Sequence, residues 1–450
     1  MPAARRGGIW RAGLRRGETM FVVRYPSQPN VCSRARLVLT RITGRSGAEA
    51  MADRYPYIIV GGRVAGAAAV DGIRELDAEG PILLLRREKH LPYDPPPLSK
   101  ALWLGKKTVE QIYRHDQSYY DQQHVALRLG RQAVGLDPES KTVTDDEGVS
   151  YQYDKLLLAT GGSPKRLSLP GADLPDLCYY RSLDDYLRVR ASVGEGTSAL
   201  VVGGGFIGSE MAAALHANGV SVTMLFLSPY LVSHVFPEEL GQALQADYER
   251  RGITVQANDA PVAFEARDGK IATTTRRGNE ITSDLVLIGV GITPETALAE
   301  AAGLETEDGI VVDEYLQTSH PDIYAAGDNA FFAYPGVARR MRLEHWDNAV
   351  GQGRQVGRNM AGADEPFTYM PYFFSDLFDF GYEAVGEVSS QLSVFADWAE
   401  PHQTGVLYYL DESKVRGVMM CNVWDKVEAA RNLIREGGPV LPEDLRGAIR

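Results

Sequence analysis

Short apolar runs that end on glycine recur along this chain, and they predict its main elements. Residues 57–60 and 199–202 are apolar runs that lead directly into glycine-rich turns. Further apolar runs at 82–85, 153–162 and 284–290 have the same character. Continuous apolar runs of this length are typical of strands buried on both faces, as in parallel sheets covered by helices. The pattern therefore predicts an α/β chain.

The two glycine-rich turns, residues 61–66 and 203–208, have the spacing of a dinucleotide-binding fingerprint. In such a turn the backbone can approach a pyrophosphate, and the following helix offers unpaired N–H groups and a positive dipole end. One copy alone is weak evidence, because glycine-rich strand ends also serve tight packing. Two copies in one chain predict two bound dinucleotides, a combination typical of a flavoenzyme.

Acidic residues follow these strands where nucleotide hydroxyl groups are expected. An acid about 20 residues beyond the first glycines should hold a ribose, and Glu88 is the nearest one, since Arg86 and Arg87 occupy the strand end. Asp328, directly after a glycine turn, could meet a ribitol hydroxyl or a phosphate water. The proline-rich loop at residues 90–100 is expected to enter a helix capped by Ser99.

The last part of the chain has a different pattern. From residue 366 onward, short strands rich in aromatic residues are expected at 372–376, 381–385 and 405–409, and a helix at 427–435. These elements predict a third domain of mixed α+β character.

Charge is distributed unevenly. The formal net charge is −12, yet residues 1–50 hold ten arginines, no lysine and only two acids. The acidic remainder disfavours nucleic acid as a partner, since nucleic-acid binding depends on cations that neutralise phosphates. The apolar runs are too short to span a membrane, so we expect a soluble, cytoplasmic protein.

The basic leader resembles an organellar transit peptide, but it also resembles a stretch read from an upstream start codon. The second interpretation is favoured because Met51 stands six residues before the first strand. We expect residues 1–50 to be disordered, and an organellar location only if the leader is a real transit peptide.

Cysteines and histidines show no pattern that indicates a reactive centre. Cys32, Cys178 and Cys421 lie far apart without a paired spacing, so no redox disulfide is expected. The eight histidines form no cluster with ligand spacing, so no metal site is expected.

Taken together, these motifs resemble the FAD-dependent pyridine nucleotide oxidoreductases, and within them the branch that contains ferredoxin and rubredoxin reductases and apoptosis-inducing factor. The resemblance covers about residues 55–435. The segments that carry it are 96–100, 158–162, 203–210, 324–328, 344–347 and 374–376.

The resemblance implies two Rossmann-like, doubly wound nucleotide-binding domains, with a discontinuous FAD domain, and a C-terminal α+β interface domain. The expected boundaries are 51–165 and 295–365 for the FAD domain, 166–294 for the NAD(P)H domain and 366–450 for the interface domain.

The resemblance also assigns roles to residues. Lys100 and Glu210 are expected to form an ion pair beside the reactive edge of the flavin, and His345 to join them at the catalytic centre. Phe374 takes the place of an aromatic residue that lies against the rings. The expected cofactor-binding residues are Gly61, Gly62, Arg63, Ala65, Gly66, Glu88, Lys100, Ala159, Thr160, Gly161, Gly203, Gly205, Phe206, Ile207, Gly208, Glu210, Gly291, Gly327, Asp328, Glu344, His345 and Phe374.

Three residues depart from the family pattern in the first nucleotide site. Arg63 replaces the second glycine of the fingerprint, Pro95 replaces an arginine, and Arg87 stands where an acid often binds the adenosine ribose. We expect that Arg63 supplies the phosphate charge that Pro95 no longer provides, so that FAD still binds. The alternative is a member of the family that has lost FAD.

The implied reaction is hydride transfer from NAD(P)H to FAD, followed by electron release to an iron–sulfur protein, a rubredoxin, a quinone or oxygen. Leu227 and Ser228 stand where an acid would select NADH, so the coenzyme is left open, with NADH slightly favoured. The competing hypothesis is a redox-responsive binding protein, similar to apoptosis-inducing factor, with slow turnover. A monomer or homodimer is expected.

Overall fold

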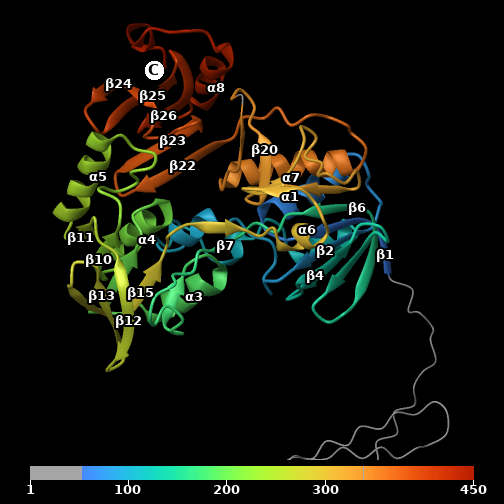
Figure 1. Ribbon diagram of the computed structural model, residues 1–450, viewed down its shortest axis with the longest axis horizontal. Coiled ribbons are helices and arrows are strands. Elements are labelled where there is room, and N and C mark those ends of the chain that lie inside the picture. The colour runs from blue at the N-terminus through green and yellow to red at the C-terminus, as the bar shows by residue number, and fades with distance from the viewer. Residues whose placement is uncertain (1–52, 338, 450) are drawn as a thin grey trace, which may run out of the picture. The chain divides into compact units, whose positions relative to one another are not determined.

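The computed structural model describes residues 53–337 and 339–449, so the expectation for residues 1–50 lies outside the described part. Three main sheets, several smaller ones and the helices around them make up this part (Figure 1). No described helix is both long and apolar enough to cross a bilayer.

The first sheet is centred on β1 (Asp53–Val60), the strand that runs into the first glycine turn. It pairs in parallel with β2 (Ile82–Arg86) and with β6 (Ser150–Leu158), so that Ile59 lies between Leu84 and Leu157. The remaining strands of this sheet are β3 (Val125–Leu129), β4 (Ala133–Asp137), β5 (Thr142–Asp145) and β19 (Ile323–Ala325).

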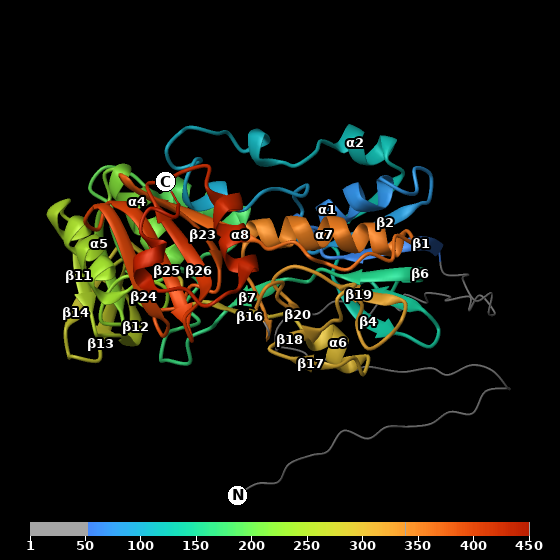
Figure 2. The same ribbon diagram turned by 90° about the horizontal axis from the view of Figure 1, so that it is seen from above.

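Two helices from distant parts of the chain cover the first sheet. α1 (Val64–Arg74) follows the first glycine turn, and α7 (Trp346–Met360) lies beside it (Figures 1 and 2). They approach closely because α7 presents Gly353 and Gly357 to the backbone of Ala65 and Ala69. The first sheet and its two helices are thus built from segments that precede and follow, along the chain, the strands of the second sheet.

The second sheet is parallel throughout, with the strand order β11-β10-β9-β15-β8. β9 (Ser198–Val202) leads into the second glycine turn and α4 (Phe206–Ala217) follows it. The other strands and helices of this region are β8 (Leu177–Tyr179), β10 (Ser221–Phe226), β11 (Thr254–Ala257), β15 (Leu285–Ile288), α3 (Leu183–Ser192) and α5 (Glu238–Arg250).

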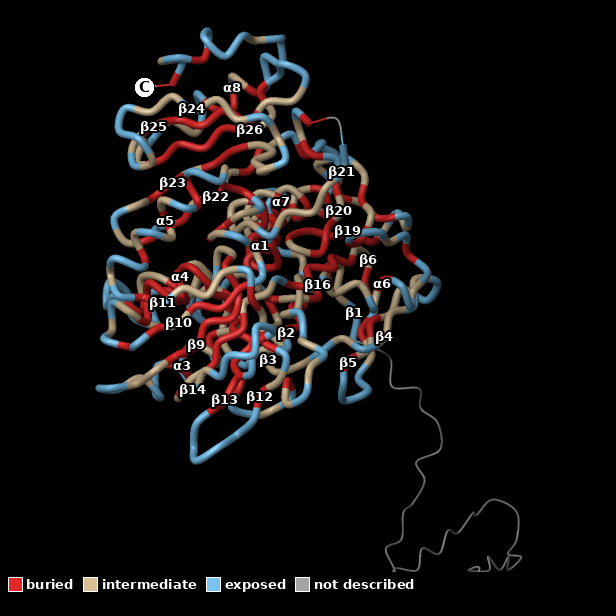
Figure 3. Tube along the Cα trace, turned by 60° about the vertical axis from the view of Figure 1, so that its left-hand side comes forward, coloured by how far each residue is buried: buried red, intermediate tan, exposed pale blue. Residues whose placement is uncertain are grey.

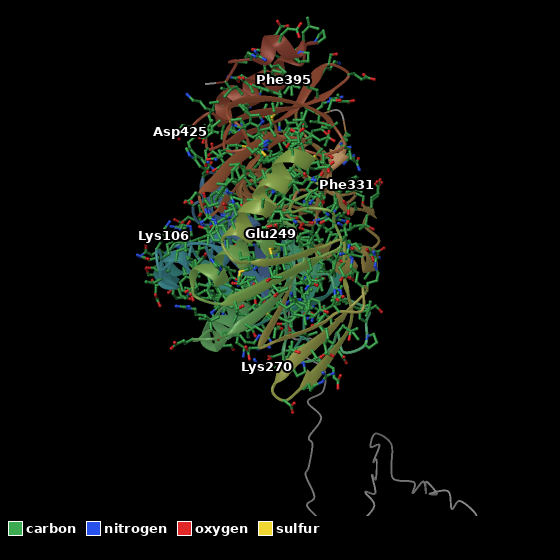
Figure 4. All side chains as sticks on the ribbon, turned by 90° about the vertical axis from the view of Figure 1, so that its left-hand side faces the viewer. Lys106, Glu249, Lys270, Phe331, Phe395 and Asp425 are labelled. Carbon is green, nitrogen blue, oxygen red and sulfur yellow. The ribbon has the colours of Figure 1, made fainter. Side chains whose placement is uncertain are left out.

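An antiparallel three-stranded sheet extends from this region. It consists of β12 (Pro261–Arg267), β13 (Lys270–Thr275) and β14 (Glu280–Ser283). Figure 4 shows Lys270 at the tip of the β12–β13 hairpin and Glu249 on α5.

The chain passes between the first and second sheets twice, as the glycine-ended strands indicated. The two passages pair with each other as β7 (Gly162–Pro164) and β16 (Ile292–Pro294), which are antiparallel. They are followed on the C-terminal side by α6 (Ala297–Ala301) and by a small sheet of β17 (Thr306–Glu307), β18 (Gly309–Val311), β20 (Ala330–Ala333) and β21 (Arg340–Met341).

The C-terminal region is an antiparallel five-stranded sheet with one helix, α8 (Val427–Glu436). Its strands are β22 (Tyr372–Leu377), β23 (Phe380–Gly386), β24 (Ser393–Glu400), β25 (Thr404–Asp411) and β26 (Lys414–Cys421). Short 3-10 helices occur at η1 (Pro96–Ser99), η2 (Glu110–Ile112) and η3 (Pro442–Leu445). The interiors of the sheets are buried, and exposed residues gather in the loops (Figure 3).

The predicted fold class is confirmed: two α/β folds, one with a parallel sheet and one with a mixed sheet whose central strands are parallel, are joined to an α+β C-terminal part. The domain boundaries stay a prediction. One local expectation is wrong, because Ser99 ends a 3-10 helix rather than capping an α-helix.

The contact between α1 and α7 leads to a stability prediction. A methyl group at Gly357 would overlap the carbonyl of Ala69, so Gly357→Ala should lower the free energy of unfolding by about 2 kcal/mol. Gly194→Ala is the matched control, since a Cβ at that exposed position would meet only Oγ1 of Thr197 at 3.9 Å and its φ is not positive. Urea unfolding followed by tryptophan fluorescence measures both variants, and equal losses would contradict the tight helix contact.

Candidate functional site

Both glycine turns open on a single cleft with a volume of about 1190 Å³. From the first turn and its sheet, the predicted residues that line it are Arg63, Ala65, Ala159, Gly161, Gly327 and Asp328. From the second turn and its sheet they are Gly203, Gly205, Phe206, Ile207, Glu210 and Gly291, and Lys100, Glu344, His345 and Phe374 complete the set. Ligands bound at the two turns would therefore meet in one space.

The first turn is shaped by glycines that do not themselves line the cleft. Gly61 has a φ of 112°, and a side chain there would overlap the carbonyl of Ala159. A side chain at Gly66 would overlap the carbonyl of Gly61. Gly62 lies against the side chains of Leu84 and Arg86, so it too serves packing. These glycines bring the start of α1 to the sheet edge without a side-chain cap on the helix.

The second turn repeats this arrangement with one difference. Gly203 has a φ of 119°, and Gly208 lies against the Gly203 carbonyl. At the middle position, the space beside Gly205 is almost open, with only a ring carbon of His234 at 3.8 Å from where a Cβ would stand. The start of α4 again has no side-chain cap. Its N–H groups are thus free to bind an anion.

A buried ion pair stands in the wall of the cleft. The Nζ of Lys100 lies 2.6 Å from Oε1 of Glu210, and the two side chains are 14% and 5% exposed. Ser375 of β22 donates a hydrogen bond of 2.5 Å to Oε1 of Glu210, and Ser99 of η1 donates one to Oε2. Because α4, η1 and β22 all contribute, the pair joins the three sheet regions.

Aromatic rings form the adjoining part of the wall. The ring of Phe374 lies 5.1 Å from Nζ of Lys100. His345, which precedes α7, stacks on Phe373 with ring centres 4.2 Å apart, and Phe206 contacts both rings edge-on. Burial lowers the pKa of His345 to about 4, and the charge of Asp328 opposes this only in part. His345 is therefore a neutral ring at physiological pH.

Arg63 occupies the first turn in a way that the sequence did not indicate. Its Nε lies 3.3 Å from Oε1 of Glu88, and its Nη2 donates to the carbonyl of Arg181 at 2.6 Å. Glu88 also contacts Arg86 and accepts a hydrogen bond from Tyr93. Burial alone would raise the pKa of the Glu88 carboxyl, but the charges of Arg63 and Arg86 hold that pKa below its usual range.

The other predicted acidic residues have arginine partners. Asp328 pairs with Arg181 at 2.5 Å, and Glu344 pairs with Arg342 at 2.7 Å. Thr160 does not line the cleft; its hydroxyl donates to the carbonyl of Glu295.

Several residues in the site escaped the sequence analysis. Phe373 and Arg181 were given no role, and Ser375 was noted only as part of the segment 374–376, without a role of its own. Ser99 was expected to cap a helix, whereas in the structure it donates a hydrogen bond to Glu210. The signal that could have found Ser375 is the strand alternation, which places it on the same buried face of β22 as Phe373 and Leu377.

Cysteines and metal-ligating side chains form no cluster in the described part of the chain. Cys178 and Cys421 are buried free thiols and do not line the cleft. Among the described residues, no group of three or more His, Cys, Asp and Glu side chains could hold a metal ion.

Comparison with protein families gives two matches. Residues 55–353 match the family model "Pyridine nucleotide-disulphide oxidoreductase". Residues 356–404 match the model "Apoptosis-inducing factor, mitochondrion-associated, C-term".

Similar curated proteins include both the reductases and the apoptosis-inducing factors of the branch that the sequence suggested. Apoptosis-inducing factor 1, mitochondrial, of Dictyostelium discoideum is 31% identical, over 85% of this chain and 78% of its own length. The ferredoxin–NAD(+) reductase component of the anthranilate 1,2-dioxygenase system of Burkholderia cepacia is 31% identical, over 87% and 96%. Rubredoxin-NAD(+) reductase of Pseudomonas putida is 35% identical, over 71% and 83%.

Solved structures of reductases are also similar to this chain. The ferredoxin reductase for the CYP199A2 system from Rhodopseudomonas palustris is similar with a TM-score of 0.81 and 30% identity, over 87% of this chain and 96% of that one. The covalent putidaredoxin reductase–putidaredoxin complex gives the same TM-score and identity, over 87% and 95%.

The two glycine turns, the shared cleft and these matches lead to one conclusion: the chain belongs to the pyridine nucleotide-disulphide oxidoreductase family, which binds FAD and NAD(P)H, and it is a flavin-dependent NAD(P)H oxidoreductase.

Proposed function

We propose that the protein is an NADH-dependent reductase that delivers electrons to a small iron–sulfur or rubredoxin-type protein. The observation that carries the proposal is the single cleft on which both glycine turns open, with the Lys100–Glu210 pair in its wall. Similarity to reductases named for ferredoxin and rubredoxin supports this class of acceptor. FAD, when bound, supplies the group that accepts a hydride and passes electrons on.

The first turn fits a flavin with its phosphates. Gly61 and Gly66 shape the turn, and the start of α1 has free N–H groups. The Nε atoms of Arg63 and Arg181 are buried and make no hydrogen bond, and that of Arg63 lies 3.3 Å from the carboxylate of Glu88. Buried guanidinium donors without a hydrogen bond favour an anion. We therefore retain the hypothesis that Arg63, together with Arg181, meets a phosphate in place of the arginine that Pro95 replaces.

We assign an electrostatic role to Lys100. Its ammonium group lies in the cleft wall beside Phe374, where it would stabilise negative charge that develops on a bound ring. Glu210 orients the ammonium group, and the hydroxyls of Ser99 and Ser375 fix the carboxylate in turn.

We assign a positioning role to the rings of His345, Phe373 and Phe206. Their stacked and edge-on contacts make an aromatic part of the cleft wall. Since His345 is neutral, it shapes the wall without adding a charge.

The second turn fits the nicotinamide coenzyme. The open space at Gly205 lets a pyrophosphate approach the backbone and the start of α4. Leu227 and Ser228 line the cleft at the end of β10 and offer neither a carboxylate nor a guanidinium group to the adenosine ribose. The preference for NADH is supported by relatives whose names specify NAD(+).

Electrons would leave without passing through a disulfide. Cys178 and Cys421, the cysteines that the structure describes, are buried, unpaired and away from the cleft. The acceptor must then take electrons from the flavin edge itself.

A second function is favoured by one observation. Residues 356–404 match the C-terminal model of apoptosis-inducing factor, and a protein of that name in Dictyostelium discoideum is similar over most of the chain. A redox-responsive binding protein would turn over slowly and change its assembly when reduced. The reductase relatives support the cytoplasmic location that we propose, whereas the name of the Dictyostelium relative points to the mitochondrion.

Stopped-flow spectroscopy distinguishes the two functions. We expect NADH to bleach the flavin absorption of the purified protein rapidly, and an added ferredoxin or rubredoxin to restore it within the same turnover. Slow reoxidation by every carrier, a persistent long-wavelength charge-transfer band and a change of oligomeric state would contradict the reductase and favour the switch.

Replacing Lys100 tests its electrostatic role. Lys100→Met should slow the reduction of flavin by NADH about 100-fold, because a preorganised charge is removed from the reacting centre. Lys155→Met is the control, since Lys155 pairs with Asp322 away from the cleft. Rapid-mixing absorbance at equal flavin content measures both, and an unchanged rate in Lys100→Met would exclude the role.

The charge state of His345 can be measured directly. The pKa of a histidine in unfolded protein is about 6.5, and burial lowers the pKa of His345 to about 4. Acidification from pH 7.5 to 5.5 should therefore leave this ring neutral. NMR of histidine-labelled protein, with His345→Gln to assign the signal, tests this. A transition near pH 6.5 would contradict the lowered pKa of His345.

A further inference from the structure

One imidazole ring stands beside the second glycine turn without a polar partner among the described residues. His234 belongs to the loop between β10 and α5, lines the cleft and is exposed to it. The Cε1 atom of its ring lies 3.8 Å from where a Cβ on Gly205 would stand. Gly205 is the second glycine of the fingerprint, the position at which the backbone of such a fold approaches the pyrophosphate. The ring therefore borders the place where two phosphates are expected.

The loop that carries His234 is fixed by main-chain hydrogen bonds on two sides. The N–H of Val232 donates to the carbonyl of Gly204 at 2.7 Å, which ties the loop to the glycine turn. The N–H of Ser390, in the connection between β23 and β24, donates to the carbonyl of His234 at 3.1 Å. The backbone of His234 is thus held between the fingerprint and the C-terminal region, while its side chain is left for the cleft.

The ring of His234 is a neutral group at pH 7. Partial removal from water is the only cause that shifts its pKa, and it lowers that pKa. Among the described residues, no acid pairs with the ring and no hydrogen bond engages its nitrogens. Its aromatic contact is edge-on to Phe206, with ring centres 5.3 Å apart. The ring can therefore turn toward a ligand without losing a hydrogen bond.

Charges on the surrounding elements do not control this ring. The titratable side chains there are Glu387 with its partner Arg339, the neutral His345, the hydroxyl of Tyr409 on β25, and Glu238 and Glu239 at the exposed start of α5. None of them shifts the pKa of His234. An incoming pyrophosphate would be the first strong charge beside the ring. An opposite charge within about 4–6 Å raises the pKa of a histidine by about one to three pH units.

We propose that His234 binds the coenzyme pyrophosphate as an imidazolium ion, so that a proton is taken up from solvent when the coenzyme binds. The inference rests on the proposed function, since it requires a coenzyme at the second turn. The start of α4 supplies N–H groups and the positive end of its dipole, and the ring adds a charge-assisted hydrogen bond from the adjoining loop. Because the ring is neutral before binding and charged afterwards, affinity rises as the pH falls between its two pKa values.

Calorimetry with ADP-ribose tests the proposal, because this ligand carries the pyrophosphate but cannot reduce the flavin. ADP-ribose is titrated into the purified holoprotein at pH 6.5 in two buffers that differ in ionisation enthalpy. The difference between the two binding enthalpies gives the number of protons taken up. We expect about half a proton or more per ligand, since the free ring is largely neutral and the bound ring largely charged. The affinity should also be higher at pH 6.5 than at pH 7.5.

A variant and a matched control identify the residue. His234→Gln keeps a polar side chain without a charge, so it should abolish the proton uptake and weaken ADP-ribose binding about tenfold at pH 6.5. The limiting rate of flavin reduction at saturating NADH should stay within about twofold, because the ring acts on the phosphates and not on the reacting atoms. His216→Gln is the control, since His216 lies in the last turn of α4, does not line the cleft and should change none of these values.

The outcomes separate this inference from the function on which it rests. Binding of ADP-ribose without proton uptake, or equal uptake by wild-type protein and His234→Gln, would overturn the role of His234 and leave the reductase intact. Uptake with NAD⁺ but none with ADP-ribose would do the same, because it would place the new charge at the nicotinamide end. Failure of wild-type protein to bind NADH and ADP-ribose at all would instead overturn the proposed function itself.

Discussion

The ion pair between Lys100 and Glu210 is the contact on which the rest of this structure depends. Charges this deeply buried are tolerated only when geometry is good and the remaining oxygen atoms are hydrogen-bonded, and removing one partner costs about 3–5 kcal/mol. Ser99 and Ser375 meet that requirement from two other elements. The pair therefore holds α4, η1 and β22 against one another. The same contact that joins the sheets also places a positive charge in the wall of the cleft.

The two glycine turns explain why the cleft is shared. Each turn ends a central parallel strand, β1 or β9, and the paired passages β7 and β16 hold the two sheets in one arrangement. Gly61 and Gly203 have similar positive φ angles and approach the backbone of the neighbouring strand in the same way. Repetition of one local structure thus creates two binding sites. The passages β7 and β16 hold the two sites so that they face each other.

Much of this could be predicted from the sequence, because it depends on local patterns. The buried strands 57–60 and 199–202, their glycine turns and the helix at 427–435 follow from residue type alone. The strands β24 and β26 and the hairpins at β4–β5 and β12–β14 were missed. β24 and the hairpins are only partly buried and carry weaker signals, whereas β26 is largely buried. Lys100 and Glu210 were paired only through the family resemblance. The contacts of Ser375, Phe373 and Arg63 depend on which distant elements meet, and no local pattern contains that information.

Hydride transfer between two rings in one cleft is the central claim, and an isotope experiment tests it most directly. NADH carrying deuterium at the transferred position is mixed anaerobically with the purified protein, and bleaching of the flavin absorption is followed in a single turnover. If the nicotinamide and the flavin meet in this cleft, deuterium on one face of the nicotinamide slows bleaching and deuterium on the other face does not. Bleaching at the same rate with either labelled coenzyme, or no bleaching at all, would contradict the account.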